Sequence, residues 1–218
     1  MDGTLVDSEK IWDIPLYEVT ERLGGRLSED GRARMVGSNM ARTVELIFAE
    51  VGRPADPDAM RDTARWIRAR TAELFAAGLP WRPGAEEALT AVRASGVPMA
   101  LVTSTERELT ELALNTIGRS FFDATVCGDE VDGLPKPHPE PYRRAARMLG
   151  VRPTDCVAIE DSPTGTAAAV GAGCTVLVVP CDVEVPPGER RVLRDSLVGV
   201  DATVLANLLA ARGRRSEA

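Results

Sequence analysis

Long apolar runs are absent from this sequence of 218 residues. No segment approaches the roughly 20 consecutive apolar residues with which a helix crosses the hydrocarbon core of a bilayer. Residues 1–4 also lack the basic region, apolar stretch and small-residue cleavage site that together mark an export signal. We therefore expect a cytoplasmic protein that has no membrane partner.

Cysteine and histidine are scarce as well. The four cysteines are scattered without a CxxC pair, and Cys127 and Cys156 fall within apolar segments. Because the spacing of a redox or zinc motif is missing, these residues are predicted to be reduced thiols with a structural role. His138, the single histidine, stands between two prolines. We expect it to shape its loop, and contact with a ligand is the alternative, because loops often carry function.

Positive charge is also in short supply, because 26 lysines and arginines face 33 aspartates and glutamates. The formal net charge of -7 argues against a nucleic-acid partner, since a polyanion is bound by a basic face that contacts its phosphates. A small anion remains compatible with this charge, because one local cation or a bound metal ion is enough to attract it. The composition therefore leaves phosphorylated metabolites open as ligands.

What the sequence does contain, from residue 84 onward, is a regular alternation of apolar runs and segments of helical period. The expected strands span residues 97–103, 123–127, 155–160 and 175–179, and the expected helices span residues 85–95, 140–149 and 164–171, with one more around Leu109, Leu112 and Ala113. Strands that are apolar throughout and separated by helices predict a parallel sheet covered on both faces. The expected fold class is therefore α/β, with a Rossmann-like core.

Residues 10–81 have a different pattern, that of successive helices without a strand. Apolar stripes mark the first and fourth of these helices, at Trp12, Leu16, Val19 and Leu23 and at Met60, Ala64, Ile67, Thr71 and Leu74. Pro15 is predicted to kink the first helix or to shorten its N-terminal part. The sequence thus predicts a core domain of residues 1–9 and 82–218 and an inserted helical cap domain of residues 10–81, positioned as a lid over a site.

Polar residues gather where the predicted strands end. Residues 103–105 are hydroxylic, residues 160–162 include two carboxylates, and Lys136 follows the strand at 123–127. Asp2, followed by a glycine and a threonine, occupies an equivalent place near the N-terminus. Because ligands of open parallel sheets bind at the carboxyl ends of the strands, we expect these groups to meet there. Carboxylates suit Mg²⁺, and a cation with hydroxyl groups suits phosphate oxygens, which is the equipment of phosphoryl transfer.

Four segments carry a resemblance to a known family. They are DGTLVDSE at residues 2–9, LVTS at 101–104, KPHPEPY at 136–142 and IEDSPTG at 159–165. Together they resemble, in order and at strand ends, the four motifs of the haloacid dehalogenase superfamily, and in particular its beta-phosphoglucomutase and phosphoglycolate phosphatase type. The resemblance spans nearly the whole chain, including the helical insertion, and it implies the same α/β core with a cap.

The resemblance implies a role for each motif residue. Asp2 would be the general acid and base, and its backbone carbonyl would bind Mg²⁺. Thr103 would hydrogen-bond the transferring phosphoryl group, and Lys136 would neutralise charge on that group and on the nucleophile. Glu160 and Asp161 would hold the metal, directly or through water. These roles are chemically consistent, because a carboxylate attacks a phosphate dianion only when nearby cations cancel the repulsion.

Three further residues are candidates for binding the substrate. Gly3 and Ser104 accompany the motif residues at the phosphate. Arg42, in the cap, would contact the leaving group, although a solvated helix arginine is the alternative. Structural alternatives exist for the motif residues too, because a terminal aspartate, a strand-ending threonine, a loop lysine and an acid pair at a helix N-terminus are all common without any function.

The nucleophile of the family stands outside this sequence. The first motif of the family is Asp-x-Asp-Gly-Thr, whose first aspartate becomes phosphorylated, and here the x is Met1. The strand that carries this aspartate in the family is central, so its loss should unpair two strands and make the chain fold poorly. A start codon assigned too late, a fragment and a pseudoenzyme are the three explanations. The first two are favoured because the other catalytic positions are intact.

The expected function is that of a Mg²⁺-dependent phosphatase that acts, as a monomer, on a small phosphorylated metabolite such as a sugar phosphate. One alternative is a phosphosugar mutase. It is disfavoured because Trp12 stands where the mutase type has a histidine, and Met40 stands where that type has an arginine for a second phosphate. The other alternative is a catalytically inactive protein that keeps the phosphate pocket.

Overall fold

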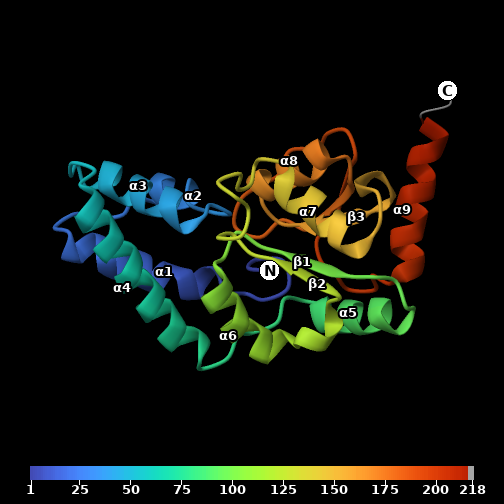
Figure 1. Ribbon diagram of the computed structural model, residues 1–218, viewed down its shortest axis with the longest axis horizontal. Helices are drawn as coiled ribbons and strands as arrows, with labels where there is room; N and C mark the ends of the chain where they lie inside the picture. Colours follow the sequence, from blue (N-terminus) through green and yellow to red (C-terminus); the bar gives the residue numbers. More distant parts are fainter. Residues whose placement is uncertain (216–218) are drawn as a thin grey trace.

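The computed structural model describes the backbone of residues 1–215, which forms a helical part and a part that contains the strands (Figure 1). The helical part consists of α1 (Glu9–Arg22), α2 (Glu29–Ala33), α3 (Met40–Glu50) and α4 (Pro57–Phe75). The other part consists of β1 (Ala100–Val102), β2 (Ala124–Val126), β3 (Val157–Glu160), β4 (Thr175–Val178) and β5 (Arg191–Leu193), with α5 (Ala85–Ala94), α6 (Arg107–Ile117), α7 (Glu140–Leu149), α8 (Pro163–Ala172), α9 (Ala202–Arg215) and the 3₁₀ turns Arg119–Phe121 and Pro153–Asp155. Within residues 1–215, no helix is both long and apolar enough to cross a bilayer.

The helices α1, α3 and α4 pack around an apolar cluster of their own. The stripe predicted for α1 supplies Leu16 and Val19, and α4 supplies Ile67, all of which are buried. Pro15 lies inside α1, which nevertheless runs as one helix from its first residue, so the predicted shortening is wrong. The proline ring removes one intrahelical hydrogen bond, and the burial of the neighbouring apolar side chains offsets that loss.

Side-chain caps explain where three of these helices begin. Ser28, Asn39 and Asp56 precede α2, α3 and α4, and each side chain accepts a hydrogen bond from a backbone N–H of the first turn. The segment between α2 and α3 contains Gly37, whose carbonyl accepts a hydrogen bond from the Ser104 hydroxyl at 3.2 Å. This contact joins the helical part directly to the loop that follows β1.

The strands form two separate parallel sheets, of order β1-β2 and β3-β4-β5. Leu101 pairs with Thr125 in the first sheet, and Ile159 pairs with Leu177 in the second. The α/β fold class and the four predicted strands are confirmed. The strand β5 was not predicted, because its three residues are partly or fully exposed and interrupt a polar segment without an apolar run.

A cavity of about 380 Å³ lies between the two sheets. Residues of β1 and β3 line it, and apolar side chains of α5, α7 and α9 line it as well. Within residues 1–215, β1 is paired on one edge only and so is β3, so each presents an unpaired edge. Met1 also lines this cavity. The expectation that two strands of the core would lack a partner is thereby confirmed.

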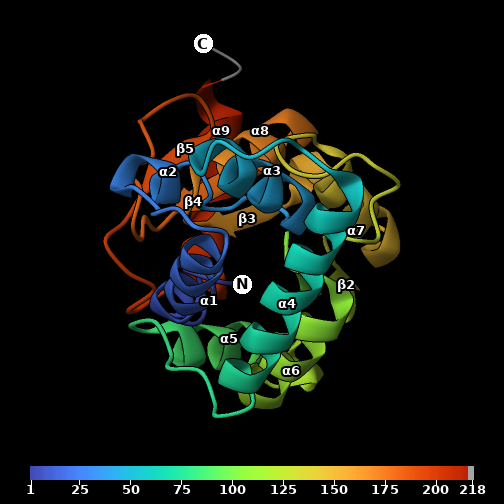
Figure 2. The ribbon, with the colours of Figure 1, turned by 90° about the vertical axis from the view of Figure 1, so that its left-hand side faces the viewer.

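The two connections between the helical part and the core run side by side. Val6 forms an antiparallel bridge with Trp81, the Asp7 N–H donates to the Pro80 carbonyl at 2.8 Å, and the Arg82 N–H donates to the Leu5 carbonyl at 2.8 Å. In Figure 2 the helices α1 to α4 face the viewer, and the start of the chain is visible between α1 and α4. The helical part therefore lies over the end of the core at which residue 1 stands.

Candidate active site

Asp2 is held by three hydrogen bonds from two parts of the molecule. Its Oδ1 accepts from the Ser8 hydroxyl at 2.6 Å and from the indole Nε1–H of Trp12 at 3.0 Å. Its Oδ2 accepts from the Thr105 hydroxyl at 2.8 Å. Trp12 belongs to α1 and Thr105 to the loop after β1, so the carboxylate is oriented by the helical part and the core together. A carboxylate fixed in this way is suited to transfer a proton along one direction.

The turn that follows Asp2 is hydrogen-bonded to Asp161. The Thr4 hydroxyl donates to Oδ1 of Asp161 at 2.5 Å, and both side chains are buried. Gly3 has a φ of +66°, and a Cβ added there would lie 2.4 Å from Oδ2 of Asp161. Only glycine allows the backbone to approach this carboxylate so closely. The Asp-Gly-Thr segment therefore brings the carboxylate of residue 2 and that of residue 161 to the same place.

Lys136 and Glu160 form a buried ion pair. The Lys136 Nζ lies 2.6 Å from Oε1 of Glu160, and their side chains are 7% and 5% exposed. The ammonium also donates to the Val102 carbonyl at 3.0 Å, and the Tyr142 hydroxyl donates to the same Glu160 oxygen. Burial acts to raise the pKa of Glu160, but the Lys136 ammonium and the Tyr142 hydroxyl lower it, so that this pKa lies below its usual value. Burial also raises the pKa of Tyr142 well above its usual value.

Hydroxyl groups occupy the loop after β1. Thr103 is buried, and its hydroxyl accepts a hydrogen bond from the Thr105 N–H at 3.2 Å. Ser104 is less buried, and its hydroxyl is the donor to the Gly37 carbonyl in the segment that joins α2 to α3. The loop therefore presents its hydroxyls where the core meets the helical part.

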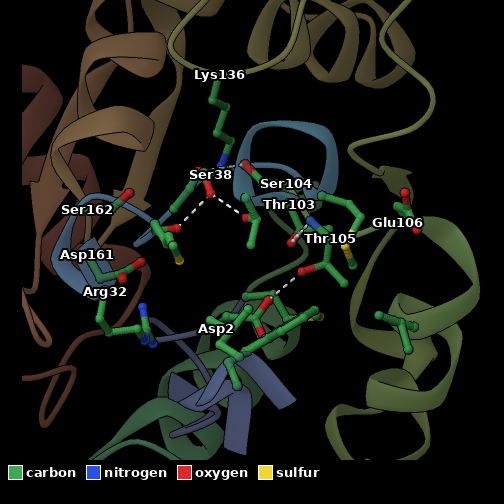
Figure 3. Close-up of a pocket in the computed structure, with 18 residues that line it drawn as sticks. Asp2, Arg32, Ser38, Thr103, Ser104, Thr105, Glu106, Lys136, Asp161 and Ser162 are labelled. Atoms are coloured by element: carbon green, nitrogen blue, oxygen red, sulfur yellow. Dashed lines mark hydrogen bonds between the residues drawn. The ribbon is translucent and has the colours of Figure 1, made fainter. Parts of the chain in front are cut away.

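Asp2, Thr103, Ser104, Lys136 and Asp161 face one pocket of about 90 Å³, which lies between the core and the helical part (Figure 3). The core contributes Met1, Asp2, Thr103, Ser104, Thr105, Glu106, Leu109, Lys136, Asp161 and Ser162. The helical part contributes Trp12, Leu16, Arg32, Met35, Met40, Thr43 and, from the segment between α2 and α3, Gly37 and Ser38. The cavity between the sheets is larger, but it is mostly apolar, so the chemistry belongs to this smaller pocket.

Comparison with known proteins assigns the family. The model of the haloacid dehalogenase-like hydrolases matches residues 1–173 of the chain. The chain belongs to the haloacid dehalogenase-like hydrolases. Hexitol phosphatase B of Escherichia coli (strain K12) is 31% identical over 197 residues, which cover 89% of this chain and 87% of that protein.

Solved structures of the family superpose over nearly the whole chain. CbbY from Rhodobacter sphaeroides, in complex with phosphate, has a TM-score of 0.83 and 27% identity, and the match covers 94% of this chain and 96% of that chain. Beta-phosphoglucomutase from Clostridium difficile also has a TM-score of 0.83, at 17% identity, with 98% and 96% covered. The second likeness supports the fold alone. The family match and the similarity to hexitol phosphatase B confirm the resemblance to this superfamily and to its phosphatases.

The metal ligands that the sequence suggests are only partly together in this hydrolase. Asp2 and Asp161 line the pocket, whereas Glu160 does not and is bound to Lys136 and Tyr142. Among the residues that the structure describes, no group of three His, Cys, Asp or Glu side chains is placed to hold a metal ion. Asp161 and the Asp2 backbone carbonyl therefore remain the candidate ligands at the pocket itself, and a role of Glu160 at the metal, directly or through water, stays a prediction. The Asp161 carboxylate and the Asp2 backbone carbonyl form an all-oxygen donor set, which fits Mg²⁺.

Arg42 is not brought to the pocket of this hydrolase. It stands in the first turn of α3, where its backbone N–H donates to the Asn39 cap, and its side chain is 61% exposed and paired with Glu45. The solvated alternative is thus the one that the structure shows. His138 is exposed as well, and its Nδ1 accepts a hydrogen bond from the Glu140 N–H, in agreement with a role in shaping its loop.

Two residues of the pocket region were missed by the sequence analysis. Arg32 lies in α2 and lines the pocket, and Asp13 in α1 forms an ion pair with it at 2.5 Å. The helix α2 has only five residues, which is too short for an apolar stripe to reveal which side faces inward. The one available signal was the conspicuous number of charged residues beside the Ser28 cap, and that pattern does not distinguish an inward arginine from an outward one.

Proposed function

We propose that this hydrolase cleaves the phosphate monoester of a small metabolite, such as a sugar phosphate, with Mg²⁺ as its cofactor. The observation that carries the proposal is the orientation of Asp2. Its carboxylate is fixed by three donors in a pocket that also contains Thr103, Lys136 and Asp161. The similarity to hexitol phosphatase B and to a CbbY structure that holds phosphate supports a phosphorylated substrate of this size.

In the proposed reaction Asp2 is the general acid and then the general base. It donates a proton to the ester oxygen of the leaving alcohol and afterwards accepts one from the water that hydrolyses the phosphoenzyme. The Thr103 hydroxyl donates a hydrogen bond to a phosphoryl oxygen, and the Lys136 ammonium balances the charge of the phosphoryl group. Bound Mg²⁺, held by the backbone carbonyl of Asp2 and the carboxylate of Asp161, would supply the remaining positive charge.

The attacking carboxylate in this proposal is an aspartate directly upstream of residue 1, as in the Asp-x-Asp-Gly-Thr pattern. Met1 is the one residue within the described chain that lines both the pocket and the cavity between the sheets. An apolar strand that passed through the cavity, between the unpaired edges of β1 and β3, would reach the pocket at Met1. The residue before Met1 would then stand beside the phosphoryl-binding groups.

The helical part acts as the lid in this proposal. Its contacts with the core include the hydrogen bond of Ser104 to the Gly37 carbonyl, which closes one side of the pocket. In this proposal the paired connections around Val6 and Trp81 are the hinge about which the helical part moves. Closure excludes bulk water and strengthens the electrostatic contacts inside the pocket.

Trp12 separates the phosphatase proposal from the mutase alternative. Its indole N–H can only donate, so it holds the Asp2 carboxylate without exchanging a proton with it. The mutase type, in the resemblance described above, uses a histidine at this place to control the acid. Because the indole keeps its proton, Asp2 remains available to protonate the leaving group and then to activate water. These two steps together make up hydrolysis.

The proposal is tested with two forms of the protein. One is the 218-residue chain, and the other is extended by about ten upstream in-frame codons, the length of a strand and its approach. We expect Mg²⁺-dependent hydrolysis of p-nitrophenyl phosphate from the extended form, which EDTA abolishes, and none from the 218-residue form. In the extended form, Asp2→Asn and replacement of the upstream aspartate by asparagine should each lower kcat by at least about a hundredfold.

Three results contradict parts of the proposal. If the upstream codons do not encode an apolar strand that ends in aspartate, the proposed nucleophile is wrong. If the extended form folds but does not hydrolyse the ester, the hydrolytic function is wrong and a phosphate-binding role replaces it. If the 218-residue form itself turns over substrate, the nucleophile lies within the printed sequence.

A further inference from the structure

Arg32 projects from the helical part into the pocket. Its side chain is 11% exposed, and the guanidinium faces the same space as Asp2 and Asp161 (Figure 3). It is held there by Asp13 of the neighbouring helix α1, whose Oδ1 lies 2.5 Å from the Arg32 Nε. Arg32 therefore reaches the pocket from the helical part, whereas Thr103 and Lys136 reach it from the core.

The rest of the wall that the helical part contributes is uncharged. It consists of the side chains of Trp12, Leu16, Met35, Met40, Ser38 and Thr43. The two hydroxyls of that wall, Ser38 and Thr43, are hydrogen-bonded to each other at 2.7 Å. Within the described side chains that line the pocket, Arg32 is thus the charged group of the helical part. The leaving group of a bound phosphate ester would therefore contact one guanidinium, hydroxyl groups and apolar side chains on this wall.

We propose that Arg32 is a specificity-determining residue that contacts the leaving group, and that Asp13 tunes it to accept a neutral, hydroxylated one. This inference rests on the proposed function and names the substrate class for it, the monophosphate of a polyol or sugar. Arg32 donates N–H groups to hydroxyl oxygens, since a guanidinium presents several donors in a rigid plane. Asp13 positions that plane.

The negative charge of Asp13 disfavours a substrate that carries a second anionic group. An arginine that binds a second phosphate or a carboxylate must supply uncompensated positive charge, but the Arg32 and Asp13 pair is neutral as a unit. Asp2 and Asp161 add negative charge to the same pocket. A leaving group that carries negative charge is therefore disfavoured beside this pair, whereas a neutral polyol is not. The ion pair selects a monophosphate over a bisphosphate or a phosphorylated acid.

The test measures binding by calorimetry, in Mg²⁺, with the 218-residue chain and its variants. The probes are inorganic phosphate, glucitol 6-phosphate as a neutral polyol monophosphate, and 2-phosphoglycolate as a phosphorylated acid. We expect Arg32→Met to weaken the binding of glucitol 6-phosphate about tenfold or more and to leave inorganic phosphate within about twofold. Asp13→Asn, which removes the carboxylate charge beside the guanidinium, should shift the preference toward 2-phosphoglycolate by about tenfold.

Controls separate recognition from a general loss of structure. Arg65 and Asp62 form an exposed ion pair on α4, with side chains 76% and 72% exposed, so Arg65→Met and Asp62→Asn should change none of the three affinities. Melting temperatures identify variants that fail to fold. Arg32→Lys keeps the charge without the planar arrangement of donors, and it should weaken glucitol 6-phosphate less than Arg32→Met does.

The outcomes distinguish this inference from the proposed function. If glucitol 6-phosphate binds folded Arg32→Met or Arg32→Lys as it binds the original chain, Arg32 has a structural role only, and the phosphatase proposal stands. If Asp13→Asn leaves the preference unchanged, the tuning by Asp13 is wrong. If the original chain binds none of the three probes, this inference falls, while the phosphatase proposal still depends on hydrolysis by the extended form.

Discussion

Gly3 is a residue of the site at which both the backbone conformation and a close contact require glycine. Its φ of +66° is in the left-handed region, and a Cβ there would overlap Oδ2 of Asp161. Left-handed backbone costs a non-glycine residue about 1–2 kcal/mol, and the overlap adds to that cost. We therefore predict that Gly3→Ala lowers the free energy of unfolding by more than about 2 kcal/mol and lowers phosphate affinity, as measured by urea unfolding and calorimetry.

Gly24 offers the matched control for this substitution. It also has a positive φ, of +84°, but a Cβ there would have no atom within 4 Å. Gly24→Ala should thus lose only the backbone contribution of about 1–2 kcal/mol and keep the affinity for phosphate. Equal losses from the two variants would mean that the contact with Asp161 is unimportant for the turn.

At the same scale, the sequence predicted the motif residues better than their surroundings. Asp2, Thr103, Lys136 and Asp161 lie together as expected, because the ends of parallel strands converge on one edge whatever the side chains are. The choice between Arg42 and Arg32 was beyond the sequence. It depends on the direction in which each short helix begins and on a partner in another helix, which local spacing does not encode.

The ion pair of Lys136 and Glu160 joins two elements, the loop after β2 and the end of β3. Because Lys136 and Tyr142 hold the pKa of Glu160 below its usual value against burial, this carboxylate stabilises the fold above that usual value, near 4.5, and the contribution is lost as the pH falls through the lowered pKa. In Lys136→Met the ammonium no longer opposes burial, and the Tyr142 hydroxyl is left as the neighbouring side-chain donor, so the pKa of Glu160 rises. The pH dependence of the contribution that Glu160 makes to stability then reverses, and stability is lost as the pH increases through the raised pKa.

We predict that Lys136→Met is less stable than the original chain by about 3–5 kcal/mol at pH 7, because an uncompensated charge stays buried. The difference in stability between the variant and the original chain should shrink steadily toward pH 4. Glu160 becomes neutral in the variant, and in the original chain its ion pair with Lys136 stabilises the fold less. Unfolding by urea at several pH values measures it. Arg152→Met, which breaks an exposed pair with Asp155, should leave the profile unchanged. A difference that is independent of pH would contradict the assignment to Glu160.

The elements themselves were predictable where periodicity is strong. The four apolar strands and the stripes of α1 and α4 came from regular spacing, and their burial follows directly from it. The shortening predicted at Pro15 was wrong because the packing of Leu16 and Val19 outweighs one lost hydrogen bond, and the alternative of a kink stays a prediction. The strand β5 was missed because pairing with β4, and not its own composition, makes it a strand.

At the scale of the whole molecule, the cavity between the sheets is a weak point in the core. Its apolar walls and the unpaired edges of β1 and β3 would be covered by the strand proposed to lie upstream of residue 1. We predict that the 218-residue form binds 8-anilinonaphthalene-1-sulfonate with a rise in fluorescence and melts at least about 10 °C below the extended form. Filling the cavity adds buried apolar surface and a central strand.

A variant of the extended form gives the control, with its apolar upstream residues replaced by serine so that length is kept and burial is lost. It should bind the dye and melt like the 218-residue form. If the extended form and the 218-residue form have the same melting temperature and neither binds the dye, the strand does not occupy the cavity.

The side-by-side connections between the core and the helical part also bear on how such proteins diversify. Val6 and Trp81 are neighbours in space, so the 74 residues between them leave the core and return at a single place. A segment inserted in this way can be lengthened, shortened or exchanged without re-registering any strand. Apart from the hydrogen bond of Trp12 to Asp2, the part that selects the substrate can therefore change in evolution while the strands that carry the chemistry stay as they are.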